Sequence, residues 1–219
     1  MQSELREPRL NFFSSFSRLI NGEKPEWAFD MPEPVTALAA GATAFVALLE
    51  DGSVWTFGSP LQQALLARTP SKEAPAGRPH VVEALGGIEV KKVAMCEWLG
   101  GALSADGALY VWGGRAGETM SIASLSETDE DVSLIEIDGG VDIADFAIGM
   151  GHVVALTAEG DVWSCGDNEH GQLGLSDQVG MFVKDWTKVK HDKERLSNIS
   201  VEAGGWGSWI IGHRNPNTS

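Results

Sequence analysis

The sequence predicts an all-β protein built from about four copies of one short unit. Residues 39–58, 94–113 and 147–166 align without a gap, and each segment begins with alanine and ends with glycine. A fourth, shorter copy spans 203–212, and the first residues of the four copies are 55, 53 and 56 positions apart. Similarity at a fixed period indicates a repeat architecture. We therefore expect one repetitive domain rather than two unrelated ones.

Each copy has the pattern of a β-hairpin. An apolar run such as TAFVALL or HVVALT leads to an acidic residue and a glycine, and a strand with an aromatic residue follows. A tight hairpin turn needs positive φ, which glycine adopts freely. Helical repeats would show a period of about 3.6 residues and much less glycine. The turn glycines are Gly52, Gly107 and Gly160, and the glycines that end each unit are Gly58, Gly113 and Gly166.

Hairpins repeated about every 54 residues are typical of a β-propeller with one repeat per blade. The segment Gly149–Leu175, GMGHVVALTAEGDVWSCGDNEHGQLGL, resembles a repeat of the regulator of chromosome condensation family. The resemblance rests on His152 before the strand, the E-G turn, the V-W-x-x-G strand and the tail that contains Gly171 and Gly174. The other copies are degenerate, and the chain is short for a family that usually builds seven blades.

We expect a single β-propeller domain over residues 1–219. Its repeats are predicted at about 35–89, 90–142, 143–198, and 199–219 joined with 1–34. The residues before Ala39 and those from Ala203 onward together amount to 55, which is the internal period. An N-terminal strand within 9–19 is therefore predicted to close the C-terminal half-blade. Two alternatives are an arc of a larger propeller and two copies paired edge to edge, because an open ring favours self-association.

Composition excludes several classes of function. The chain has 16 Lys and Arg against 31 Asp and Glu, a net charge of -15, so we expect no binding to nucleic acid. No run approaches the roughly 20 apolar residues of a membrane helix, and we expect no membrane association. The N-terminus has no secretory signal and the two cysteines form no disulfide framework. These features predict the cytoplasm, the nucleus or both.

The sequence carries no recognisable catalytic motif. There is no phosphate-binding glycine loop, no C-x-x-C pair and no H-E-x-x-H helix, and the five histidines are dispersed. We expect no catalytic residue, no cofactor and no metal. His152 is interpreted as a structural residue of the repeat, which bonds to backbone at the edge of a blade.

The candidate partner-binding residues lie mainly in the loops that immediately precede the first, apolar strand of each hairpin. Trp98 and Trp206 occupy such loops, and the loops converge on one face if a ring forms. Exposed aromatic side chains are favoured at protein interfaces. The candidates are Glu97, Trp98, Met150, Trp206 and, in a lysine-containing segment farther along, Trp186.

The sequence thus predicts a non-enzymatic scaffold or adaptor that binds an unidentified protein partner through the loop face. The family resemblance implies an alternative, guanine-nucleotide exchange on a small GTPase, as in the founding member. An enzyme that uses a propeller as its framework is a third reading, which the lack of a catalytic motif disfavours.

Overall fold

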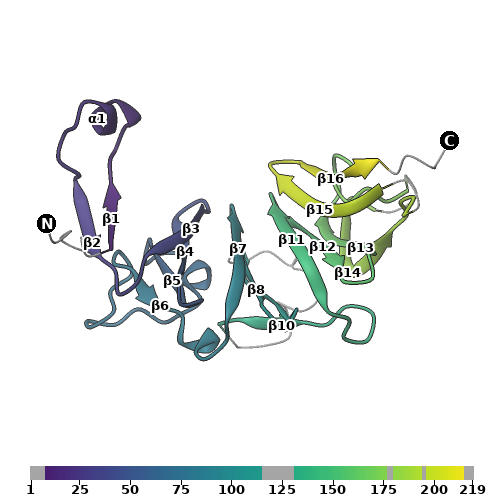
Figure 1. Cartoon of the computed structure of the whole chain (residues 1–219), viewed down its shortest axis with the longest axis horizontal. Coiled ribbons are helices and arrows are strands. Elements are labelled where there is room, and N and C mark those ends of the chain that lie inside the picture. Colours follow the sequence, from purple (N-terminus) through teal and green to yellow (C-terminus); the bar gives the residue numbers. More distant parts are fainter. Residues whose placement is uncertain (1–7, 115–130, 177–179, 194–195, 215–219) are drawn as a thin grey trace, which may run out of the picture.

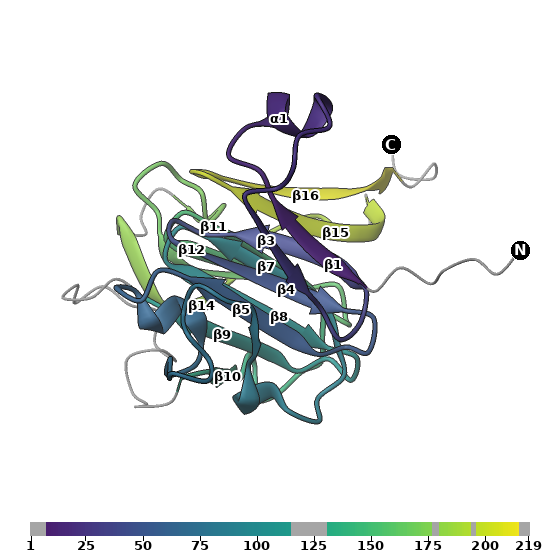
Figure 2. The same cartoon turned by 90° about the vertical axis from the view of Figure 1, so that its left-hand side faces the viewer.

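The computed structural model describes residues 8–114, 131–176, 180–193 and 196–214. They form three four-stranded antiparallel sheets and two two-stranded ones. The sheets stand side by side in a curved row, with a two-stranded hairpin at each end (Figure 1). Seen from the N-terminal end, the inner strands, which are the first strands of the four-stranded sheets (β3, β7 and β11), lie above β10 (Figure 2). The predictions of an all-β fold and of propeller-type repeats are confirmed.

The three four-stranded sheets are called blades and are numbered along the chain. Blade 1 consists of β3 (Val35–Ala40), β4 (Ala44–Leu49), β5 (Val54–Gly58) and β6 (His80–Val81). Blade 2 consists of β7 (Val90–Cys96), β8 (Leu99–Ser104), β9 (Leu109–Gly113) and β10 (Ser133–Ile135). Blade 3 consists of β11 (Ile143–Gly149), β12 (His152–Thr157), β13 (Val162–Asp167) and β14 (Phe182–Val189).

The remaining strands form the two terminal hairpins. The N-terminal hairpin pairs β1 (Arg9–Phe12) with β2 (Trp27–Asp30), and the helix α1 (Phe16–Ile20) lies between them. The C-terminal hairpin pairs β15 (Leu196–Gly204) with β16 (Gly207–Arg214). Two short 3-10 helices, η1 (Gln63–Leu66) and η2 (Glu83–Leu85), belong to blade 1.

Glycines make the tight hairpins possible in two ways. The turn residues Gly52, Gly107 and Gly160 have φ of 81°, 94° and 81°, the region that side chains with a Cβ rarely adopt. At the end of the third strand, a Cβ on Gly166 would lie 2.2 Å from the carbonyl oxygen of Gly151. Gly58 and Gly113 approach the preceding loop in the same way. The repeated glycines therefore allow the third strand to pass directly under the loop between the first two.

The hydrophobic core lies between blades rather than at one centre. The first cluster joins blades 1 and 2, the second joins blades 2 and 3, and the third joins blade 3 to the C-terminal hairpin. Trp112 on β9 shows how tight these junctions are. It is fully buried against blade 1, and its Nε1 donates to the carbonyl oxygen of Leu65, 3.1 Å away. Each inner strand also contacts the next, from β3 through β7 and β11 to β15.

The fourth copy is shifted by one residue from the sequence alignment. Its hairpin closes on the pair Gly204↔Gly207, as blade 3 closes on Gly149↔His152. Gly207 therefore occupies the position of His152, whereas the alignment gave that position to Ser208. A slip of one residue reverses the faces of a strand. As a result Ile210 packs on blade 3, and Trp209 and Ile211 are exposed.

The predicted closing strand does not close the C-terminal hairpin. β1 pairs with β2 from Arg9↔Asp30 to Phe12↔Trp27, and β16 pairs with β15. Only residues 31–34 separate β2 from β3, and four residues span at most about 14 Å. The N-terminal hairpin must therefore stay beside blade 1, where Leu10 packs against its core. The curved row places blade 1 and the C-terminal hairpin far apart, at opposite ends (Figure 1).

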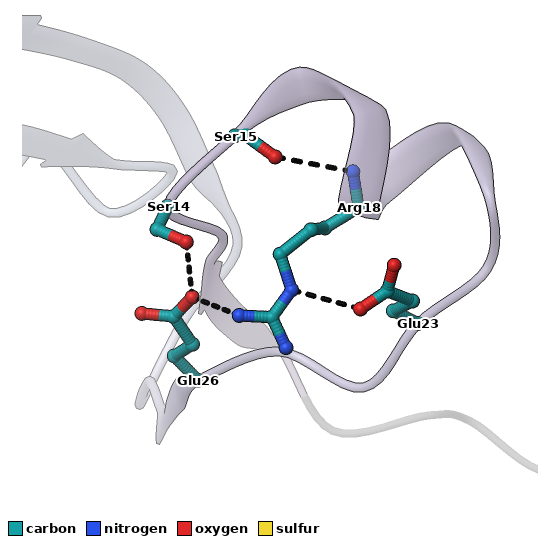
Figure 3. Close-up of polar contacts among 5 residues, drawn as sticks. All are labelled: Ser14, Ser15, Arg18, Glu23 and Glu26. Atoms are coloured by element: carbon teal, nitrogen blue, oxygen red, sulfur yellow. Dashed lines mark hydrogen bonds and ion pairs between the residues drawn. The ribbon is translucent and has the colours of Figure 1, made fainter.

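The connection between β1 and β2 is held by its own polar contacts (Figure 3). Ser15 caps α1 by accepting from the backbone N–H of Arg18. The Arg18 guanidinium donates to Glu23 at 2.9 Å and to Glu26, which also accepts from Ser14. These contacts are solvent-exposed. They organise the connection without burying it against any blade.

Candidate functional site

The loops between the first and second strands of the blades meet at one end of the molecule. The backbone N–H of Ala42 donates to the carbonyl of Glu97, and that of Met150 donates to Gly205, both at 2.8 Å. Cys96 also has a hydrogen bond with the backbone of Gly205, although burial raises the pKa of its thiol. Loops from every described blade and from the C-terminal hairpin are thus linked into one face, called the loop face.

Two of the predicted binding residues, Glu97 and Trp98, form the loop of blade 2. Glu97 has φ of 49°, an unusual backbone conformation for a residue with a Cβ. Trp98 is half-buried against the junction of blades 1 and 2. Its carbonyl oxygen accepts from the N–H of Gly114 at 2.7 Å. This loop is consequently held on both sides, and Trp98 presents only part of its ring to solvent.

Trp206 is the most exposed of the predicted residues. It lies at the tip of the C-terminal hairpin, with 60% of its surface accessible. The ring of His170, from the loop between β13 and β14, stacks on it with centroids 5.0 Å apart and planes 13° apart. Both rings line a pocket of about 400 Å³, together with Gln172, Leu173 and Trp209. The structure therefore places Trp206 on the rim of a preformed hollow.

His152 links blade 3 to the C-terminal hairpin beneath this face. It is fully buried, with Nδ1 3.2 Å from the carbonyl oxygen of Met150 and Nε2 2.8 Å from Ser208 Oγ. A carbonyl only accepts, so Nδ1 carries the hydrogen and Nε2 accepts from the serine hydroxyl. Burial lowers the pKa of His152, and the hydrogen bond with the backbone of Met150 acts in the opposite direction.

Trp186 does not join the other candidates. It lies on β14, the outermost strand of blade 3, and packs against the core cluster between blades 2 and 3. Met150, by contrast, is half-buried within the loop face itself. The structure thus brings Glu97, Trp98, Met150 and Trp206 to one end of the molecule. Trp186 lies apart from them, on the outermost strand of blade 3.

Sequence reasoning missed two residues of this site, His170 and Trp209. His170 belongs to the tail that follows the third strand in the repeat with the best family match. Its position in that tail was the only sequence signal that could have pointed to it. Trp209 follows the turn of the fourth copy, and the one-residue shift of that copy concealed its exposed face. Their place around the pocket emerges only from the packing of the C-terminal hairpin on blade 3.

Within residues 8–114, 131–176, 180–193 and 196–214, no group of three or more His, Cys, Asp or Glu is arranged to hold a metal ion. Cys96 and Cys165 are free thiols. No helix in this part of the chain is long and apolar enough to cross a membrane.

Comparison with known proteins identifies the repeats. Residues 143–172 and 159–211 each match the regulator of chromosome condensation (RCC1) repeat. The chain belongs to the RCC1 repeat family. The two matched ranges cover blade 3 and the C-terminal hairpin, which include the pocket and both Trp206 and His170. The family assignment that the sequence suggested is therefore confirmed where the repeat is best preserved.

Two human proteins are among the similar sequences. The chain is 35% identical to the E3 ubiquitin-protein ligase HERC2 over 172 residues, which is 77% of this chain and 3% of HERC2. It is 31% identical to the regulator of chromosome condensation over 144 residues, 66% of this chain and 34% of that protein. This RCC1 repeat chain therefore spans a small part of either relative.

A solved structure supports the fold. The RCC1-type protein Prp20p from Saccharomyces cerevisiae superimposes with a TM-score of 0.60 at 18% identity. The match covers 89% of this chain and 50% of Prp20p. The structure of Prp20p was described together with its binding to Gsp1p and histones, which is a property of that protein. The present chain corresponds to about half of such a propeller.

Proposed function

We propose that this RCC1 repeat chain is a non-enzymatic protein-binding module that engages its partner through the loop face around Trp206. The observation that supports the proposal is the pair of stacked rings, Trp206 and His170, on the rim of the 400 Å³ pocket. An exposed tryptophan beside a hollow can bury a large apolar area in a partner. The hydrogen bonds that tie the loops together keep this surface in one arrangement before binding.

The charge of the chain narrows the partner class. A net charge of -15 opposes contact with a phosphate backbone, so a protein is favoured over nucleic acid. The cytoplasm or nucleus is the proposed location.

Affinity purification tests the proposal with matched variants. The whole chain is immobilised and exposed to a native lysate, beside Trp206→Ala and the control Leu134→Ala. Leu134 is 53% exposed on the outer strand β10, away from the pocket. We expect at least one protein to be retained by the parent chain and by Leu134→Ala and to be lost with Trp206→Ala. Retention of the same proteins by all three chains would contradict the proposed surface.

Similarity to the regulator of chromosome condensation supports a second candidate, nucleotide exchange on a small GTPase. Release of a fluorescent guanine nucleotide from purified small GTPases measures this directly. We expect no acceleration by this chain, because it spans only 34% of that relative. A clear, concentration-dependent acceleration would reverse the ranking of the two functions.

A further inference from the structure

The two ends of the curved row carry complementary halves of one blade. In blades 1 to 3 the first two strands form an inner pair and the last two an outer pair joined by a longer connection. The C-terminal hairpin has the position of an inner pair, because β15 lies against the inner strand β11. The N-terminal hairpin has the connectivity of an outer pair, with α1 inserted between its strands. Neither hairpin forms a four-stranded sheet in the described part of the chain.

Residues at equivalent positions are buried inside the row and exposed at its ends. Trp209 and Ile211 on β16 correspond to Val154 and Leu156 on β12, which are 3% exposed. At the end of the row, Trp209 is 56% and Ile211 is 53% exposed. The side chains of this face lack the next blade that covers them elsewhere.

The N-terminal end of the row also exposes an apolar residue at a position that is buried inside the row. Leu38 on β3 corresponds to Phe146 on β11, since β3 and β11 pair with their neighbours at equivalent positions. Phe146 is fully buried under blade 2, and Leu38 is 50% exposed. A second pocket, of about 530 Å³, lies between blade 1 and the aromatic residues of the N-terminal hairpin, Phe12 and Trp27 among them. The N-terminal end thus presents the surface that an inner pair of strands would cover.

We propose that a second copy of this chain completes the blade, with β1 of one copy pairing with β16 of the other. The backbone hydrogen bond from Met31 to Pro8 is equivalent to the one from Val82 to Val54 in blade 1, which aligns Leu10 with Ser164 of β13. By the register of β12 with β13, Ser208 then lies opposite Asn11 and Trp209 opposite Leu10. Trp209 and Ile211 then cover Leu38 of the second copy. Contacts of this head-to-tail kind generate a ring only if the rotation closes. A pair of copies that closes at both ends has six complete blades and two composite ones.

Chain length and apolar area agree with two copies. The chain matches 50% of Prp20p, so two copies together supply about the length of one Prp20p chain. The exposed parts of Trp27, Leu38, Trp209 and Ile211 amount to roughly 400–500 Å² per chain, or about 900 Å² for a closed pair. The backbone edges and the pocket walls add to this value. A stable interface buries about 1,200–2,000 Å² in total.

Mass measurement tests the pairing. Sedimentation or light scattering of the whole chain is expected to give about 47 kDa, twice the 23.4 kDa of one chain. Trp209→Glu and Leu38→Glu, at opposite ends of the row, should each raise the dissociation constant at least tenfold. The control Leu134→Glu, at a similarly exposed outer position, should leave it unchanged. A single species of 23.4 kDa at 100 μM, or a ladder of higher multiples, would overturn the proposal.

Disulfide formation between two singly substituted chains distinguishes pairing between two copies from ring closure within one chain. Asn11→Cys and Ser208→Cys chains are mixed and oxidised, and circular dichroism confirms that each is folded. We expect a covalent heterodimer on a non-reducing gel, because residues opposite each other on paired strands are close enough for a disulfide. If the mixture gives none and a chain with both substitutions forms an internal bond instead, the ring closes within one chain and the proposal is wrong.

Discussion

The junction between blades 1 and 2 and the two ends of the row differ in how far they bury their large apolar side chains. Inside the row, Trp112 is fully buried and donates its indole hydrogen to Leu65. At the C-terminal end, Trp209 is 56% exposed although it occupies a position that is buried in blade 3. Burial of a side chain in this repeat therefore depends on whether a neighbouring blade covers its face. It does not depend on the side chain alone.

The largest expected effect is the loss of Trp112 from the complete junction. Trp112→Ala should lower the free energy of unfolding by about 3–5 kcal/mol, because it leaves a cavity and an unpaired carbonyl. Trp209→Ala, measured at a concentration where the chain is monomeric, should change it by less than about 0.5 kcal/mol. Urea denaturation compares the two. Equal effects would show that the C-terminal end is covered in solution.

A smaller effect is expected where a glycine passes under a loop. Gly113 has φ of 103°, and a Cβ there would lie 2.2 Å from the carbonyl oxygen of Trp98. Gly113→Ala should therefore cost about 2–3 kcal/mol. Gly22, in the N-terminal hairpin, has φ of 68° with open space around it, so Gly22→Ala should cost only about 1 kcal/mol. Thermal unfolding of the two variants therefore separates the cost of the steric contact at Gly113 from the cost of the backbone conformation alone.

A pH-dependent effect is expected at the link between blade 3 and the C-terminal hairpin. Burial lowers the pKa of His152, so the unfolded chain binds its proton more readily than the folded chain does. This contribution to stability is present above about pH 6.5 and is lost as the pH falls through the folded pKa. The melting temperature should fall between pH 7.5 and 5.5. The slope should be shallower in His152→Gln and unchanged in His80→Gln.

The smallest effect is expected in the exposed connection of the N-terminal hairpin. Hydrogen bonding to Glu23 raises the pKa of Arg18, and the hydrogen bond from Ser14 lowers that of Glu26. Solvent screens such pairs strongly. Arg18→Gln should leave the melting temperature of the chain unchanged within error. A clear drop would indicate that α1 packs against a blade in solution.

The repeat units were predictable because each one repeats a local signal. The acidic and glycine residues of the turns and the glycines under the loops encode hairpins without reference to the rest of the chain. The period of about 54 residues predicts the three blades and the partial fourth unit that forms the C-terminal hairpin. The fourth copy was misaligned because Ala203 resembles the first residue of the other copies, and no local signal separates its position from that of Glu202.

The candidate site was predictable only in part. Aromatic residues in the hairpin loops led to Trp206, and the convergence of the loops is visible in their hydrogen bonds. The stacking of His170 on Trp206 joins segments from different blades, so no sequence spacing reports it. The prediction that the N-terminal strand closes the ring was wrong, because a length that matches one period does not determine the curvature of the row.

The buried Arg68 has a consequence for how blade 1 responds to a change of pH. Its guanidinium donates to the carbonyl oxygens of Thr56, Ala74, Pro75 and Arg78, at 2.8–3.3 Å, and so braces the long loop between β5 and β6. Desolvation lowers the pKa of Arg68, but arginine keeps its charge throughout the physiological range. This loop therefore keeps its shape in acid, whereas the link through His152 weakens. A fall in pH therefore weakens the junction of blade 3 with the C-terminal hairpin and leaves the β5–β6 loop of blade 1 unchanged.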